Sequence, residues 1–279
     1  MGSSGIISFI IILNTCIFTY QGIKNHLFFE KYKFNVDKVI LNKEYWRLVT
    51  SGLVHVSWMH LIFNMMTLYL LSSVLEQQVG TFKFILIYLA GLIGGNLFAL
   101  LIHRRHGDYS SAGASGAVNA VIFASIALFP GMSIGLFFIP ISIPGWLFAI
   151  VYTLYSIYAV RSKQDNIGHE AHLGGALAGV LTAVLLYPSA LVDNYIPILA
   201  TLVPIGLFIY FVLTRPGILL IDNFFFKKHQ KYTIDQEYNL SRKKKEIQLD
   251  EILDKIQKNG INKLTKEEMK KLKEFSKQL

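Results

Sequence analysis

The chain has 279 residues, of which 53% are hydrophobic and only 16% are charged, and it carries a formal net charge of +9. Soluble domains usually carry about 25% charged residues, so the composition excludes an ordinary soluble protein and favours one that crosses a membrane several times. The single cysteine, Cys16, excludes an intrachain disulfide.

Apolar runs divide the chain into candidate membrane helices, because a spanning helix needs about 20 mostly apolar residues. In chain order they cover about 5–22, 59–75, 82–102, 115–129, 144–160, 171–188 and 195–214. The first run has neither the basic start nor the cleavage site of a signal peptide, so we interpret it as an anchored helix. We therefore predict an all-α, polytopic bundle with six core helices, a seventh C-terminal span and a short soluble helical tail.

The fourth run is too short to cross the membrane fully. It ends at Phe129-Pro130-Gly131, so its helix covers only about 22 Å of a hydrocarbon core about 30 Å thick. Its first residue, Ser115, is therefore expected below the membrane surface. The polar loop 106–111 must dip inward with it, which backbone tolerates only beside a wet cavity or under a cover of protein.

Strongly polar residues stand at the starts of the second, fourth and sixth runs. His60 and Asn64 are four residues apart and share one helical face. Ser115 opens the fourth run and His172 the sixth. These three helices run in the same direction, so His60, Ser115 and His172 are expected at similar depth on one side of the membrane. Strongly polar residues in membrane spans are commonly functional. Taken alone, a serine among small residues is more simply explained as a helix-packing residue.

Three motifs occur in order on these runs: His55-Val56-Ser57-Trp58-Met59-His60 with Asn64, then Gly113-Ala114-Ser115-Gly116, then Ala171-His172 with Gly175 and Gly179. On these residues the chain resembles the rhomboid intramembrane serine proteases, over roughly residues 5–190. Trp46-Arg47, Glu76 and Gly80 also look like landmarks of that family.

The resemblance implies a catalytic dyad and an oxyanion hole. Ser115 is implied as the nucleophile and His172 as its general base, with His60, Asn64 and the Ser115 backbone N–H as the oxyanion hole. The chemistry suits these residue types, because an imidazole can take the serine proton and return it to the leaving amine. We expect small residues at the site, Gly113, Gly116, Gly175 and Gly179, to let the fourth and sixth helices approach closely.

Several neighbouring residues have simpler interpretations. His55 is expected to stabilise its loop, Asn119 to make a hydrogen bond between helices, and 103–106 to form a charged helix end. His169-Glu170-Ala171-His172 is one residue short of the H-E-x-x-H zinc motif. No metal and no cofactor are expected, and orientation of His172 is expected from packing, since neighbours on a helix point apart.

Charge gives a membrane orientation that conflicts with the resemblance. Basic residues gather on the side that carries the predicted site: Lys24, Lys31, Lys33, Lys38, Lys43, Arg47, Arg104, Arg105, Arg161 and Lys163. The positive-inside rule would place this face in the cytoplasm, whereas the resemblance implies that it lies outside. We adopt the resemblance, since the first long loop has structural uses for lysine, and we expect a multi-pass protein of a bacterial inner (cell) membrane.

The tail differs in composition from the rest of the chain. Residues 227–279 hold 15 Lys and Arg against 9 Asp and Glu. Leu249, Ile252, Leu253 and Ile256 form an apolar stripe that ends at Asn259-Gly260. Thr265-Lys266-Glu267-Glu268 predicts a capping box before a second helix with Met269, Leu272 and Phe275. The predicted parts are a catalytic membrane core (1–190), an extra span (191–226) and a basic helical tail (227–279).

Two functions are consistent with the sequence. The first is an intramembrane serine endopeptidase that cleaves single-span membrane proteins in or near their transmembrane helix. The alternative is a catalytically idle rhomboid-like protein that binds or escorts transmembrane helices. In both cases the partners are transmembrane proteins and the lipid bilayer, and no nucleic acid is expected; the sequence leaves the oligomeric state open.

Overall fold

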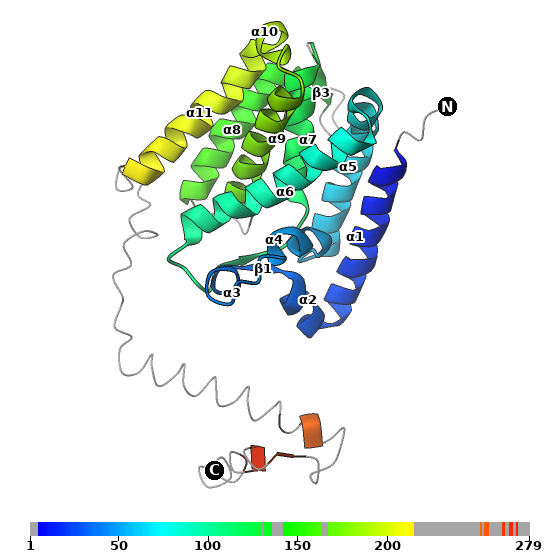
Figure 1. The fold of residues 1–279 in the computed structure, drawn as a ribbon, viewed down its shortest axis with the longest axis vertical. Helices are drawn as coiled ribbons and strands as arrows, with labels where there is room; N and C mark the ends of the chain where they lie inside the picture. Colours follow the sequence, from blue (N-terminus) through cyan, green and yellow to red (C-terminus); the bar gives the residue numbers. More distant parts are fainter. Residues whose placement is uncertain are drawn as a thin grey trace. The chain divides into compact units, whose positions relative to one another are not determined.

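The computed structural model describes residues 5–129, 131–135, 142–162 and 167–214, with positions 252, 254–256, 264–265, 268–269 and 272 of the tail. Long helices form on every predicted apolar run (Figure 1): α1 Ile6–Lys24, α5 Trp58–Val79, α6 Thr81–His103, α7 Ser115–Leu128, α8 Gly145–Ser162, α9 His169–Leu186 and α11 Tyr195–Thr214. The all-α helix bundle is therefore confirmed.

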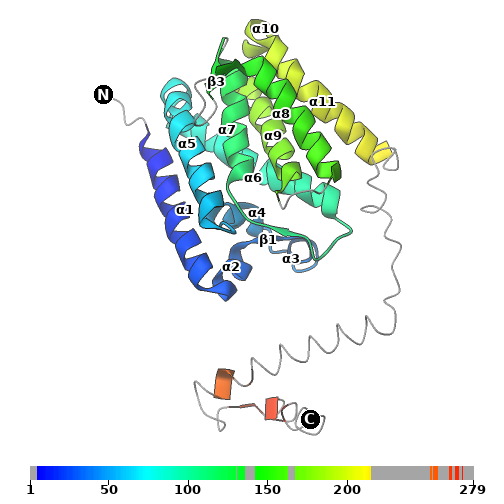
Figure 2. The same ribbon diagram turned by 180° about the vertical axis from the view of Figure 1, so that it is seen from behind.

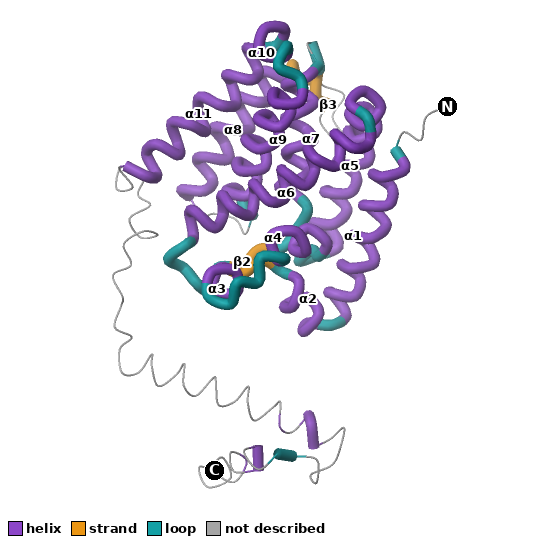
Figure 3. Tube along the Cα trace, in the orientation of Figure 1, coloured by secondary structure: helices purple, strands orange, loops and turns teal. Residues whose placement is uncertain are grey.

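Short elements connect these helices (Figure 3). They are α2 His26–Tyr32, β1 Phe34–Asn35, α3 Val36–Ile40, α4 Arg47–Thr50, the 3-10 turn η1 Ser51–Leu53, β2 Ser110–Ser111, β3 Ser133–Gly135, β4 Ser142–Pro144 and α10 Ala190–Asp193. Strand β1 pairs antiparallel with β2, and β3 with β4. The polar loop before Ser115 is thus attached through its strand β2 to the segment that follows α2, and Asp108 within it stays exposed.

Five helices in the described part are long and apolar enough to cross a membrane: α1, α5, α6, α9 and α11. Helices α7 and α8 are apolar but shorter. Every residue of α7 from Gly116 to Ala127 is buried, so this short helix is enclosed by the others (Figure 2). The sequence-based expectation of a short fourth helix is confirmed.

Helices α6, α7 and α9 approach one another closely through glycines. A Cβ on Gly175 would fall on the Gly116 carbonyl, and a Cβ on Gly179 on the Ala120 backbone. A Cβ on Gly95 of α6 would lie 2.6 Å from the Ala171 carbonyl oxygen. Backbone contact of this kind fixes the helices closely in register, since no flexible side chain separates them.

The segment between α1 and α5 is held by Arg47, which is 5% exposed. Its Nε donates to the Glu44 carboxylate at 2.6 Å, and its Nη1 donates to the carbonyls of Glu30 and Lys33 at 2.8 and 2.7 Å. The pKa of the Glu44 carboxyl is lowered, chiefly by its hydrogen bond to Arg47. Arg47, one of the basic residues on the side of the predicted site, therefore has a structural role within its own loop.

The chain divides into two compact units, Met1–Phe226 and Lys227–Leu279. In the second unit the predicted capping box is confirmed, because Thr265 N donates to the Glu268 carboxylate at 2.7 Å and Glu268 N to the Thr265 hydroxyl at 3.2 Å. Lys255 Nζ also contacts that carboxylate at 2.7 Å. Of the other residues predicted for the tail, Leu249, Leu253, Asn259, Gly260 and Phe275 lie outside the described residues.

Candidate active site

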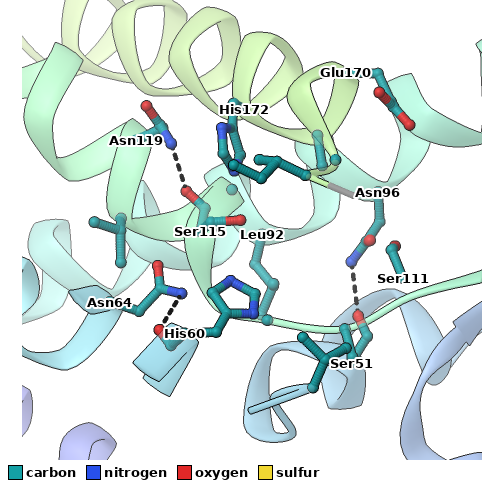
Figure 4. Close-up of a pocket in the computed structure, with 18 of the residues that line it drawn as sticks. Ser51, His60, Asn64, Leu92, Asn96, Ser111, Ser115, Asn119, Glu170 and His172 are labelled. Atoms are coloured by element: carbon teal, nitrogen blue, oxygen red, sulfur yellow. Dashed lines mark hydrogen bonds between the residues drawn. The ribbon is translucent and has the colours of Figure 1, made fainter. Parts of the chain in front are cut away.

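One cavity of about 1220 Å³ receives side chains from α5, α6, α7, α8 and α9 and from the loop before α7. Its lining includes Ser115, His172, His60 and Asn64, the four side chains predicted to carry the chemistry, together with Gly113 and Gly116. Figure 4 shows the four side chains around a common space. The other two predicted glycines, Gly175 and Gly179, lie at the α7–α9 contact behind it.

Ser115 is the first residue of α7, and the turn before it is fixed by the backbone. Gly113 has a φ of +142°, which residues with a side chain rarely adopt. A Cβ there would also lie 2.6 Å from Cε1 of His60. Gly113 N donates to the Ser51 carbonyl at 2.9 Å. The turn therefore needs glycine for both its backbone conformation and its space.

His172 lies in the first turn of α9, and its ring points toward the Ser115 side chain (Figure 4). The Tyr152 hydroxyl of α8 lies 3.1 Å from His172 Nδ1, and the two rings stack at 6.4 Å. On the other side the His169 ring is 5.5 Å away, and it contacts Tyr155 of α8 at the same distance. The imidazole is thus oriented by aromatic neighbours and one hydroxyl.

His60 and Asn64 face Ser115 from α5. The helix begins with Ser57 as its cap, whose hydroxyl accepts from His60 N at 3.2 Å. Asn64, 7% exposed, donates through Nδ2 to the His60 carbonyl at 3.1 Å. An amide NH₂ carries two hydrogens, so this bond uses one donor of the group.

His55 stabilises the loop before α5, as expected. Its Nε2 accepts a hydrogen bond from Ala114 N at 3.2 Å, and its Nδ1 lies 3.1 Å from the Thr19 hydroxyl of α1. Burial, followed by the proximity of His60, lowers the pKa of His55 from 6.5 to about 3. His55 is therefore a neutral link between α1 and the residue before Ser115.

Two features near the site were not predicted from the sequence. Tyr152 was missed because a tyrosine within an apolar, aromatic-rich run gives no polar signal. His103 was expected only as part of a charged helix end; it is 6% exposed, and its Nε2 lies 2.7 Å from Glu170 Oε1. Asn119, which was expected to bond between helices, donates through Nδ2 to the Ser115 carbonyl within α7 at 2.9 Å, and its side chain also interacts with Tyr152 of α8.

The model of the Rhomboid domain matches residues 42–189, more than half of the chain. The chain belongs to the rhomboid family. Among its relatives are the YdcA rhomboid protein of Bacillus subtilis (strain 168), 31% identical over 52% of this chain and 69% of the relative, and the rhomboid protease GluP of the same organism, 31% identical over 54% of this chain and 28% of the relative.

A plant relative is also similar to this rhomboid chain. The mitochondrial RHOMBOID-like protein 12 of Arabidopsis thaliana is 32% identical over 48% of this chain and 44% of the relative. The chain thus spans less than half the length of two of these three relatives. Family membership and the apolar helices make it an integral multi-pass membrane protein, and some relatives are named as proteases. The tail, residues 232–278, matches a family of unknown function (DUF6576).

Proposed function

We propose that this rhomboid is an intramembrane serine endopeptidase that uses Ser115 and His172 as a catalytic dyad. The observation that carries the proposal is the single cavity lined by Ser115, His172, His60 and Asn64. A packing serine needs no histidine beside it and no donors around it. A nucleophile needs both, together with space for a substrate carbonyl.

The placement of these groups supports the following reaction. Ser115 Oγ attacks the scissile carbonyl while His172 Nε2 takes its proton. The Nδ1–H then donates to the Tyr152 hydroxyl, 3.1 Å away, which keeps the tautomer that frees Nε2 for this task. His172 next gives the proton to the leaving amine, and a water molecule hydrolyses the acyl-enzyme by the reverse sequence.

The oxyanion of each tetrahedral intermediate would be received by His60, Asn64 and the backbone N–H of Ser115. The last group is available because Ser115 is the first residue of α7, where backbone N–H groups have no partner within the helix. Donors fixed in a water-poor site need little reorganisation as charge develops, and each is worth roughly 10²–10³ in kcat.

The proposed substrate is a single-span membrane protein with small or helix-breaking residues near the membrane boundary on the active-site side. An intact membrane helix satisfies its own backbone hydrogen bonds and hides its peptide bonds. Gly and Pro disfavour helix by about 1 and 3 kcal/mol relative to Ala, so local unwinding is easiest there. Replacing them with Leu is expected to slow cleavage sharply, while changes at the opposite end of the span matter less.

Purified protein in liposomes, given such a substrate, tests the proposal. Wild type is expected to cleave it, with or without EDTA, and Ser115→Ala to leave it intact. Turnover by Ser115→Ala would exclude the dyad, and loss with EDTA that zinc restores would point to a metal enzyme. If wild type binds the substrate helix without cleaving it, the idle rhomboid-like function holds instead.

Membrane and orientation are part of the same proposal. A bacterial inner membrane with the active face outside the cytoplasm stays a prediction, since relatives include bacterial, mitochondrial and chloroplast proteins. Single cysteines in 25–46, introduced after Cys16→Ser, test it in intact cells. Labelling by an impermeant maleimide is expected; protection until the cells are opened would put the active face in the cytoplasm, as the basic residues suggest.

A further inference from the structure

A compact polar cluster near the start of α9 lines the same cavity as His172, and the proposed mechanism does not use it. Glu170, 6% exposed, lies with Oε1 2.7 Å from Nε2 of His103, and the same oxygen accepts a hydrogen bond from the Tyr109 hydroxyl. The His103 and Tyr109 rings stack in parallel, with centroids 3.6 Å apart and planes 6° apart. The two hydrogen-bond partners of the Glu170 carboxylate therefore also pack against each other.

The three residues come from three different segments. His103 is the last residue of α6, and Tyr109 stands in the loop that continues through β2 to Ser115. Glu170 is the second residue of α9, two before His172. The Glu170 carboxylate thus connects the loop that leads to the proposed nucleophile with the helix that carries the proposed base. It also connects both of them with the end of α6.

Glu170 and His172 project on different sides of α9. Two residues along an α-helix correspond to a rotation of about 200°, and Figure 4 shows Glu170 well away from Ser115 while His172 points toward it. Glu170 therefore does not touch the reacting atoms. Its effect on them passes through the helix backbone.

That backbone has little room to adjust. The Ala171 carbonyl, between Glu170 and His172, lies where a Cβ on Gly95 would be 2.6 Å away and one on Gly116 3.3 Å away. A shift of the first turn of α9 must therefore be shared with α6 and α7.

We propose that Glu170 is a positioning residue which, through His103 and Tyr109, sets the distance between Ser115 and His172. This inference rests on the proposed protease function. A buried carboxylate that loses its partners must move toward water, and here that movement displaces the base. A misplacement of about 1 Å in a catalytic constellation can lower the rate about 10²-fold.

The test compares Glu170 with a second buried carboxylate, Glu76, which is 2% exposed and lies near the C-terminal end of α5. Glu76 accepts hydrogen bonds from the hydroxyls of Ser8 and Thr81 at 2.8 and 3.0 Å. Both Glu→Ala variants remove a buried carboxyl group together with its hydrogen bonds. Only Glu170→Ala removes the link to α9.

We expect Glu170→Ala to lower kcat about 10²-fold per folded molecule, with KM within about threefold of wild type. Glu170→Gln keeps the shape and an acceptor for Tyr109, and should recover at least about tenfold of that loss. Tyr109→Phe keeps the ring stack and loses only the hydroxyl, so it should lower kcat about fivefold and remain testable if Glu170→Ala does not fold. Glu76→Ala should lower the Tm and leave kcat within about twofold.

The wild type is first treated with a fluorophosphonate that labels reactive serines, which separates the two proposals. Absence of both Ser115 labelling and cleavage would sink the protease function and this inference with it. With active wild type, an unchanged kcat in the folded Glu170 and Tyr109 variants would overturn the positioning role alone. An equal loss of kcat in Glu76→Ala would do so as well, because any buried charge would then have the same effect.

Discussion

The two ends of the helix bundle each bury a carboxylate, but they are built differently. Near the C-terminal end of α5, Glu76 is satisfied by two hydroxyls, Ser8 of α1 and Thr81 of α6. At the start of α9, Glu170 is satisfied by an imidazole and a phenol. Only Glu170 belongs to the lining of the cavity that also holds Ser115.

The comparison of Glu76 with Glu170 indicates how a structural polar group can be distinguished from one near a functional site in a membrane protein. A carboxyl group is buried at both ends, so burial alone does not mark a functional site, because structural networks bury polar groups too. What distinguishes the start of α9 is that the proposed nucleophile, the proposed base and the proposed oxyanion donors line one cavity. Variants can test this difference: one removes a group at the end of the bundle that holds the cavity, here called the cavity end, and a control variant removes a similar group elsewhere.

The largest effect is expected from the dyad. Ser115→Ala and His172→Ala should each reduce kcat by at least about 10³-fold, and the double variant should be no worse, because residues that act as one unit are not additive. The measurement is cleavage of a single-span substrate in liposomes.

Ser125→Ala is the matched control for the dyad. Ser125 is the second serine of α7 and is fully buried, and its hydroxyl donates to the Val121 carbonyl at 2.7 Å. This variant should keep kcat within about twofold. If Ser125→Ala lost as much activity as Ser115→Ala, the loss in Ser115→Ala would not show that Ser115 is the nucleophile.

A smaller loss is expected at the oxyanion hole. Asn64→Ala should lower kcat by about 10²-fold or less, since His60 and the backbone N–H still hold the oxyanion. Asn194→Ala is the control: its amide donates to the Ile126 carbonyl at 2.6 Å, at the C-terminal end of α7. That variant should affect the Tm and leave kcat unchanged. An effect of Asn64→Ala on KM alone would show that Asn64 binds substrate instead.

The fold was largely predictable because the apolar runs are long and separated by polar or Pro-Gly breaks. Even the short helix α7 could be bounded, since Phe129-Pro130-Gly131 follows its last residue, Leu128. The small elements between α1 and α5 were not predicted. They depend on tertiary contacts, such as the capture of two backbone carbonyls by Arg47.

The four side chains of the candidate site could be chosen from sequence because each stands near the start of a helix that runs in the same direction. Tyr152 could not be chosen. Tyr152, Tyr155 and Tyr158 recur every third residue of α8, and the rotation of that helix decides which of them faces His172. Likewise, the partners of Glu170 depend on the path of the loop after α6, which spacing does not reveal.

A variant of Tyr152 therefore tests how His172 is oriented, with a smaller expected effect on kcat. Tyr152→Phe keeps the ring stacked on His172 and removes the hydroxyl 3.1 Å from Nδ1. We expect kcat to fall about tenfold, because general-base catalysis by His172 depends on the orientation of its ring. Tyr187→Phe is the control, because the Tyr187 hydroxyl accepts a hydrogen bond from Lys83 at 3.0 Å outside the cavity. Equal kcat values for both variants and wild type would show that packing alone orients His172.

The smallest effect concerns the stability of the cavity end as the pH falls. Burial lowers the pKa of His55 from 6.5 to about 3, so the folded protein holds it neutral while the unfolded chain binds a proton below pH 6.5. Its contribution is complete above pH 6.5 and is lost as the pH falls toward 3, by roughly 1.4 kcal/mol per pH unit. Thermal unfolding in detergent between pH 7.5 and 5 should therefore show a smaller drop in Tm for His55→Gln than for wild type. The control is His26→Gln, since the His26 side chain is 82% exposed, and it should keep the wild-type pH dependence. If His55→Gln kept that dependence too, protonation of His55 would not be what destabilises the cavity end in acid.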